Sequence, residues 1–149
     1  MTFTGALFYI LHLPVLPAWA LLMLAPGHAL TRRWVHSGAI PLLMGAIYAL
    51  LLGSALLFGQ ADPDAGMGSL TGVMALLSHP VGALTGWAHY LVFDLFVGAW
   101  IARDARRLAY GHAGTLPVLL LALVFAPLGL AAHFLRRLAH HDGIAIPAP

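Results

Sequence analysis

Two ionisable side chains, His89 and Asp94, lie in the same long apolar part of the sequence. An ionised carboxylate at the centre of a membrane helix costs about 3 kcal/mol or more unless it is paired, hydrated or protonated, so Asp94 is a candidate catalytic acid. The alternative is a structural Asp that links two helices through hydrogen bonds. Tyr90 lies one turn before Asp94, and Tyr48 lies at mid-depth of an earlier helix, so both are candidate partners.

Helical geometry separates these two residues. Five residues at about 100° each place His89 and Asp94 about 140° apart, so they cannot form a pair within one helix. Tyr90 and Phe93 lie between them, and Trp87 and Tyr48 add further aromatic rings. We predict that these four aromatic residues bind a long, mostly apolar ligand.

Histidines on different predicted helices form a second candidate group. His12 and His89 lie at similar depth, and His133 lies somewhat closer to the surface. Imidazoles at one level can ligate a metal or the iron or magnesium of a tetrapyrrole. The alternative is isolated histidines bonded to carbonyls that Pro14 and Pro17 expose. No regular ligand spacing is present, so we predict no metal site, and the sequence identifies no cofactor.

The composition indicates that most of the chain lies in lipid. Hydrophobic residues make up 61% of its 149 residues and charged residues 8%, against about 25% charged in a soluble domain. The stretches 1–31, 34–61, 65–93 and 108–135 carry no charge, and each exceeds the roughly 20 residues that cross a membrane. The absence of Cys excludes thiolate chemistry, and arginines scattered at helix ends do not indicate nucleic-acid binding.

These stretches predict an all-α, polytopic membrane protein, a four-transmembrane-helix bundle. The spanning helices are expected at about 5–24, 34–58, 83–102 and 115–135, the last with a kink at Pro127. A short interfacial or re-entrant helix, capped by Ser69, is expected at 69–78, between helices two and three. Because no repeat is visible, residues 1–149 are predicted to form a single membrane domain.

Basic residues predict the orientation of the helices. Arginines join helices one and two and follow helix three, which favours a cytoplasmic location for these connections and a non-cytoplasmic location for both termini. Arg136 and Arg137 oppose this topology, because they follow helix four. The first stretch has no basic n-region and no A-x-A-like site, so we do not interpret it as a signal peptide.

The run GWAHYLVFDLFVGAWIARD at residues 86–104 resembles the central motif of the abscisic-acid-deficient-four-like membrane family, which includes plant neoxanthin synthase. The resemblance extends to Pro17-x-Trp19, Ala25-Pro26, the start of the short helix at 69–73, and Pro127-x-Gly129. It implies a small four-helix membrane protein, and plant members act in converting the epoxy-carotenoid violaxanthin to the allenic carotenoid neoxanthin. His12 stands where Asn is expected. Compact loops and the lack of a transit peptide suggest a bacterial member in the inner membrane.

The resemblance favours a protein of carotenoid or isoprenoid metabolism, with isomerase-type activity on a polyene lipid. Opening an epoxide next to a polyene needs an acid for the oxygen and a base for a carbon-bound proton. Asp94, kept protonated by desolvation, suits the acid, and His89 or His12 suits the base.

Two other functions stay open. One is a non-catalytic pigment-binding subunit of a larger membrane complex, which would hold a carotenoid, haem or chlorophyll. The other is a small proton-coupled transporter, in which Asp94 would carry the proton. Membrane lipid and a polyene lipid are the expected partners, without nucleic acid, and assembly as a homo-oligomer or within a larger complex is left open.

Overall fold

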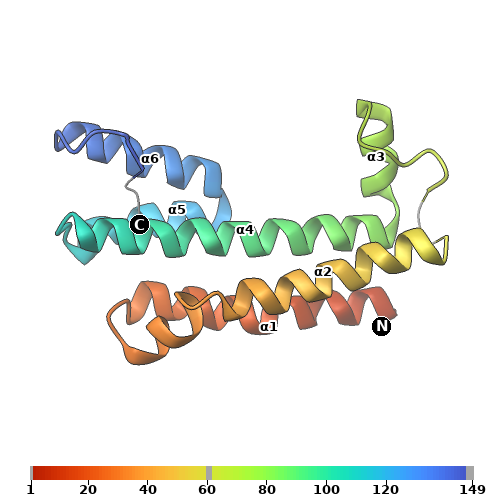
Figure 1. Cartoon of the computed structure of the whole chain (residues 1–149), viewed down its shortest axis with the longest axis horizontal. Helices are drawn as coiled ribbons and strands as arrows, with labels where there is room; N and C mark the ends of the chain where they lie inside the picture. Colours follow the sequence, from red (N-terminus) through yellow and green to blue (C-terminus); the bar gives the residue numbers. More distant parts are fainter. Residues whose placement is uncertain (1, 60–61, 147–149) are drawn as a thin grey trace. The chain divides into compact units, whose positions relative to one another are not determined.

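A computed structural model describes residues 2–59 and 62–146 of the chain (Figure 1). Over these residues it contains only helices. They are α1 (Phe3–Leu24), a π-helical turn η1 (Thr31–Val35), α2 (Ala39–Leu57), α3 (Leu70–Ser78), α4 (Pro80–Arg107), α5 (His112–Val124) and α6 (Ala126–Ala139). The predicted all-α class is confirmed.

Three of the described segments are long and apolar enough to cross a membrane, namely Phe3–Leu24, Thr31–Leu57 and Pro80–Arg107. They correspond to the first three predicted spans, and the chain is a polytopic membrane protein. α2 begins five residues later than predicted, because Gly38 takes a positive φ of 76° that separates it from η1. α4 extends beyond the predicted 83–102 at both ends, since Pro80 suits a first helical turn and the charged residues after Ala102 stay helical.

The helices divide into two compact units, which both contain part of α1 and part of α4. The first unit comprises Met1–Pro17 and Ser37–Phe93, and the second comprises Ala18–His36 and Asp94–Pro149. The sequence predicted one membrane domain without this internal division. We describe each unit by itself.

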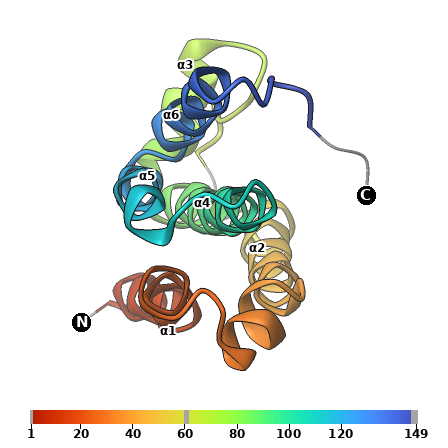
Figure 2. The same cartoon turned by 90° about the vertical axis from the view of Figure 1, so that its left-hand side faces the viewer.

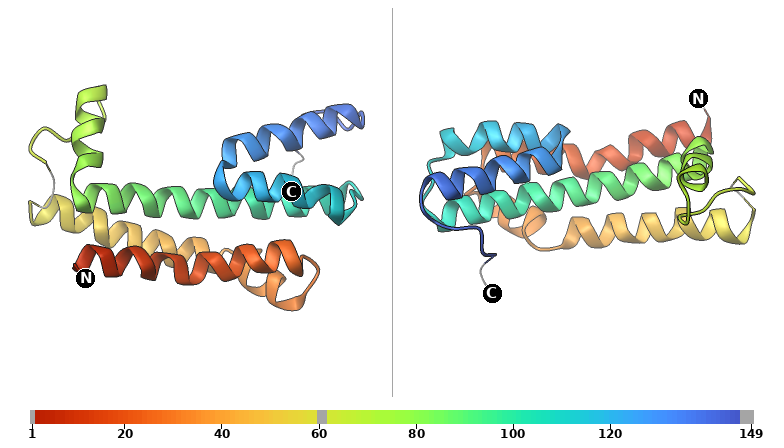
Figure 3. Two further views of the ribbon diagram at one scale, coloured as in Figure 1. Left: turned by 180° about the vertical axis from the view of Figure 1, so that it is seen from behind. Right: turned by 90° about the horizontal axis from the view of Figure 1, so that it is seen from above.

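In the first unit, α3 stands across the beginning of α4 (Figures 1 and 3). The predicted cap is present, since the Ser69 hydroxyl accepts a hydrogen bond from the Gly72 N–H at 3.1 Å. The turn into α4 requires glycine, because a Cβ on Gly82 would lie 1.9 Å from the Leu76 carbonyl oxygen. Leu70 and Met74 are largely exposed on α3, as expected for a short helix at a membrane surface.

In the second unit, the structure differs from the single helix predicted over 115–135. Two helices run antiparallel, and α6 returns beside α5 (Figures 1 and 3). Two contacts fix the register of this hairpin: Arg136 Nη1 donates to the Gly114 carbonyl at 3.1 Å, and Gly129 faces Ala122. At 13 and 14 residues, each helix is shorter than the roughly 20 residues that cross a membrane.

The reversal has a local cause at Phe125 and Pro127. A proline inside a continuous helix loses a hydrogen bond and clashes with the preceding turn, but at the start of a helix it fits without loss. Phe125 leaves the helical conformation, with φ −141° and ψ 77°, and its carbonyl accepts bonds from Leu128 and Gly129, each at 3.0 Å. A Cβ on Gly129 would lie 2.4 Å from the Ala122 Cβ, so glycine is needed for this close approach.

The hairpin changes the placement of the arginines. All seven belong to the second unit, and the reversal returns Arg136 and Arg137 to the connection between α4 and α5. The sequence prediction had placed these two across the membrane from the arginines that follow helix three. With the hairpin, they no longer oppose the positive-inside pattern.

Candidate functional site

In the first unit, the His12 ring makes hydrogen bonds with a backbone carbonyl and with the indole of a tryptophan. Its Nδ1 is 2.7 Å from the Phe8 carbonyl, and its Nε2 is 3.3 Å from the Trp87 indole N–H. A carbonyl accepts and an indole N–H donates, so the His12 proton lies on Nδ1 and the Nε2 lone pair points at Trp87. His12 is therefore a poor candidate for the base, because its lone pair is already in use.

The aromatic residues that the sequence predicts as ligand contacts lie in two groups of rings. Trp87 stacks on Phe8 at 5.8 Å and on Tyr90 at 5.2 Å between ring centroids. His89 lies 5.9 Å from the Tyr48 ring and 4.6 Å from the Phe93 ring. Phe8 and Trp87 of the first group line a groove with Thr4 and Leu84.

Asp94 belongs to the second unit, where it is buried. It lies on α4, which continues without a break to Arg107. At about 100° per residue, Asp94 points about 110° away from the mean direction of Phe96, Val97 and Trp100. Asp104 points within about 30° of that direction. Of the two acids, Asp104 shares the face of the helix that carries these large side chains.

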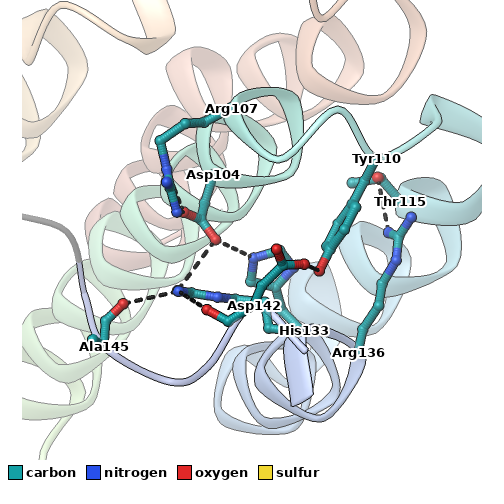
Figure 4. Close-up of polar contacts among 9 residues, drawn as sticks. Asp104, Arg107, Tyr110, Thr115, His133, Arg136, Asp142 and Ala145 are labelled. Carbon is teal, nitrogen blue, oxygen red and sulfur yellow. Dashed lines mark hydrogen bonds and ion pairs between the residues drawn. The ribbon is translucent and has the colours of Figure 1, made fainter. Parts of the chain in front are cut away.

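Asp104 is the centre of a buried polar cluster that the sequence interpretation missed (Figure 4). One oxygen accepts from His133 Nε2 at 2.8 Å, and the other accepts from Arg107 Nη2 at 2.9 Å. Arg137 Nη1 lies 3.4 Å from the first oxygen, as an ion pair without hydrogen-bond geometry. Of these three contacts, only the pair with Arg107 joins residues that are close in the sequence.

The Asp104 carboxylate determines which nitrogen of His133 carries the proton. Because a carboxylate only accepts, Nε2 donates to Asp104 and Nδ1 keeps the lone pair of the neutral ring. His133 is fully buried, and Nδ1 has no hydrogen-bond partner among the described residues. In hydrolytic triads a carboxylate also orients the imidazole base, although there it bonds to Nδ1 and leaves Nε2 as the base. His133 is thus positioned to accept a proton at Nδ1.

Arg137 brings a second unsatisfied group to the cluster. Its side chain is 2% exposed, and its Nη2 donates to the Ala145 carbonyl at 2.8 Å. Its Nε and Nη1 have no hydrogen-bond partner within residues 2–59 and 62–146. A buried guanidinium with free donors can stabilise an oxygen atom that gains negative charge.

An apolar groove of about 360 Å³ lies beside this cluster. It is lined by side chains of α4, α6 and the C-terminal segment, namely Phe96, Val97, Trp100, Leu130, Phe134 and Ile146. Asp104 follows Trp100 by one turn of α4, and His133 follows Leu130 by nearly one turn of α6. The Trp100 and His133 rings meet edge to face at 5.5 Å. The acid–imidazole pair therefore lies next to one end of the groove.

Further polar contacts tie the C-terminal segment to this site. The Tyr110 hydroxyl donates to the Asp142 carboxylate, and the Arg136 guanidinium lies over the Tyr110 ring at 4.2 Å (Figure 4). Burial, followed by the hydrogen bond and the negative charge of Asp142, raises the pKa of Tyr110 above its ordinary value. Figure 2 shows α5 and α6 beside the end of α4.

The structure does not gather the histidines into a ligand set. His12 and His89 make separate ring contacts in the first unit, whereas His133 is in the second. No group of three His, Asp or Glu side chains suited to a metal ion occurs in the part of the chain that the structure describes.

The sequence carried one signal for the missed cluster. Ala126, Gly129, His133 and Arg137 recur at spacings of three and four, and all four are buried on one face of α6. Small residues mark the face of a membrane helix that packs on another helix. A histidine and an arginine on that face are expected to be buried with a partner.

The comparisons with known proteins identify a family for this chain. The sequence profile described as ABA DEFICIENT 4-like matches residues 6–133. Protein ABA DEFICIENT 4, chloroplastic, from Arabidopsis thaliana is 25% identical over 127 residues, which are 83% of this chain and 56% of that protein. The chain thus spans little more than half the length of this relative. No solved structure is significantly similar to this chain. Since the profile covers most of the chain, the protein belongs to the ABA DEFICIENT 4-like family.

Proposed function

We propose that this protein is a membrane-embedded enzyme of carotenoid or other isoprenoid metabolism that isomerises a polyene lipid by proton transfer. Family membership supports the substrate class. One observation carries the chemistry: His133 Nδ1 is buried and has no hydrogen-bond partner within the described ranges, while Asp104 holds Nε2 at 2.8 Å beside an apolar groove. In this proposal the groove binds one end of the polyene.

The proposed reaction moves one proton and needs no electron carrier. His133 Nδ1 removes a proton from a carbon next to the polyene, and the Asp104 carboxylate stabilises the imidazolium that forms. The carbon–oxygen bond of an epoxide breaks as a new carbon–carbon double bond forms. Arg137 stabilises the oxygen, which then takes the proton from His133. Substrate and product have the same composition, so the step is an isomerisation.

This proposal gives different roles to the three residues that the sequence predicts as catalytic, Asp94, His89 and His12. Asp94 stays a predicted acid from the sequence; it is buried in the second unit, and the proposed step assigns it no proton. His89 stays a predicted base, and its ring lies 5.9 Å from the Tyr48 ring. For His12, the bond from Trp87 favours a structural role.

Pigment conversion in cells tests the proposal. The chain would be expressed in a bacterium engineered to make epoxy-carotenoids, and pigments would be separated and identified by mass. His133→Gln and Asp104→Asn are expected to lower conversion at least about 100-fold, as for loss of a general base. His141→Asn is the matched control, because His141 is exposed and Asn tolerates its φ of 63°. Conversion that survives both substitutions would overturn the assignment of the site.

The colour of the purified protein separates the rival functions. A carotenoid spectrum supports polyene binding, and a Soret band supports a tetrapyrrole-binding subunit instead. If carotenoid is bound but never converted, the protein is a pigment-binding subunit rather than an enzyme.

We also propose a location in the bacterial inner membrane, with the arginine-rich connections on the cytoplasmic side. The seven arginines, all in the second unit, support this orientation. Because α6 returns towards the α4–α5 connection, we propose the cytoplasmic side for the C-terminal end of α6 as well. This replaces the non-cytoplasmic position predicted for that end from the sequence.

A further inference from the structure

Besides Arg136, four arginines of the second unit form no ion pair with a carboxylate within the described ranges. They are Arg32, Arg33, Arg103 and Arg106, on η1 and the last turns of α4. The ion pairs that arginine makes in the described structure use only Arg107 and Arg137, and both go to Asp104. This part of the unit therefore has an excess of positive charge.

His36 lies beside two of these arginines. Arg103 and Arg106 are both close enough to interact electrostatically with its ring. Both ring nitrogens of His36 are buried and lack a hydrogen-bond partner among the described residues. Burying polar nitrogens next to two cations is unfavourable unless a further group satisfies them. An anion with several acceptor oxygens would accept hydrogen bonds from both guanidiniums and from the N–H of the imidazole.

Backbone contacts hold the surrounding side chains in place. Arg106 Nη1 donates to the Pro26 carbonyl at 3.0 Å, which leaves the other nitrogens of this guanidinium for a ligand. Arg32 Nη1 donates to the Gly27 carbonyl at 2.6 Å, and the Thr31 hydroxyl donates to the Ala25 carbonyl at 2.6 Å. The segment that carries His36 is thus fixed before any ligand binds.

We propose that His36, Arg103 and Arg106 bind a phosphate group. Phosphate oxygens match the planar guanidinium through paired hydrogen bonds, and an imidazole N–H adds a further donor. Two sources supply this chemistry: the headgroup of an anionic phospholipid, or free phosphate from water. The proposal is independent of the acid–imidazole pair, because the residues of the two sites do not overlap.

Arg136 provides a matched control for the loss of one positive charge. It belongs to the same unit, but its guanidinium lies over the Tyr110 ring at 4.2 Å and donates to Thr115 at 3.0 Å. Arg136→Gln therefore removes a charge without changing the proposed site.

Two binding measurements on the full chain in a neutral detergent test the proposal. The first compares phosphatidylglycerol with phosphatidylcholine by native mass spectrometry. The second titrates inorganic phosphate against chloride at constant ionic strength and follows tryptophan fluorescence. Arg103→Gln and Arg106→Gln are each expected to weaken binding about fivefold, and the double variant about 25-fold. Arg136→Gln should leave both affinities unchanged.

The outcomes separate the two sources. Loss of phosphatidylglycerol binding alone identifies a lipid headgroup, and loss of inorganic phosphate binding alone identifies a free-phosphate site. Should the double variant fail to fold, His36→Gln gives the same comparison with an expected loss of about fivefold. If these variants bind both probes as Arg136→Gln does, or if the wild-type chain binds neither, the proposal is wrong.

Discussion

Replacing Asp104 by Asn would test whether one buried carboxylate organises the second unit. The substitution keeps the size of the side chain and removes its charge. It leaves Arg137, which is 2% exposed, without a counter-ion, and it weakens the bond to His133. Removing one partner of a buried ion pair costs about 3–5 kcal/mol, so we expect Asp104→Asn to lower the free energy of unfolding by about 3 kcal/mol.

Arg107 belongs to the same cluster but is more exposed to solvent than Arg137. Its side chain is 48% exposed although it also pairs with Asp104, at 2.9 Å. Exposed ion pairs contribute about 0–1 kcal/mol, so Arg107→Gln should lower the free energy of unfolding by less than about 1 kcal/mol. The Arg107 contact is the shorter of the two, at 2.9 Å against 3.4 Å for Arg137, so burial rather than distance accounts for the expected difference.

A double-mutant cycle makes this reasoning quantitative. Arg137→Gln should cost about 3 kcal/mol in the wild type and close to zero in the Asp104→Asn background, because the unpaired charge is then gone. Unfolding in mixed micelles can be followed by tryptophan fluorescence, since Trp100 lies 5.5 Å from the His133 ring. Equal costs for Arg107→Gln and Asp104→Asn, or an additive cycle, would refute the central role of Asp104.

Three further predictions follow from the packing of the helices. Gly98→Ala should lower the free energy of unfolding by about 1–3 kcal/mol, because the new Cβ would lie 2.3 Å from Trp19 Cη2. Gly45→Ala is the control and should not destabilise the protein, since no atom lies within 4 Å of its Cβ position. Thermal unfolding of both variants checks this prediction. Gly129→Leu should separate α5 from α6. Two cysteines introduced at facing positions of α5 and α6 should cross-link when residue 129 is Gly and should not cross-link in the Gly129→Leu variant. A topology reporter fused after Ile146 and one inserted at Gly111 should both be found on the same side of the membrane. Reporters on opposite sides would contradict the antiparallel arrangement of α5 and α6.

Much of the fold could be predicted because the apolar stretches are longer than a membrane is thick. The first three spans and the Ser69-capped helix depend on local properties, namely stretch length, a cap and a following proline. The hairpin could not be predicted in this way. A proline in a long apolar stretch fits either a kink or a reversal, and only the contact of Gly129 with Ala122 decides between them.

The candidate site was harder to predict, because its residues lie far apart in sequence. Asp104 follows a membrane span and neighbours arginines, so its sequence context is typical of a headgroup anchor. Its burial depends on α6 returning to cover it with His133. Where contacts are local, sequence spacing is enough: Trp87 and Tyr90 are three residues apart on one helix, and their rings stack at 5.2 Å.

The ion pair of Arg137 with Asp104 also bears on how the chain is assembled in the membrane. The chain contains no lysine, and an arginine side chain does not lose its proton, so α6 enters the membrane region with a permanent charge. Its buried partner is on α4, which is synthesised earlier. The last hairpin can therefore complete its insertion only against an α4 that is already in place, and this imposes an order on biogenesis from the amino to the carboxyl end.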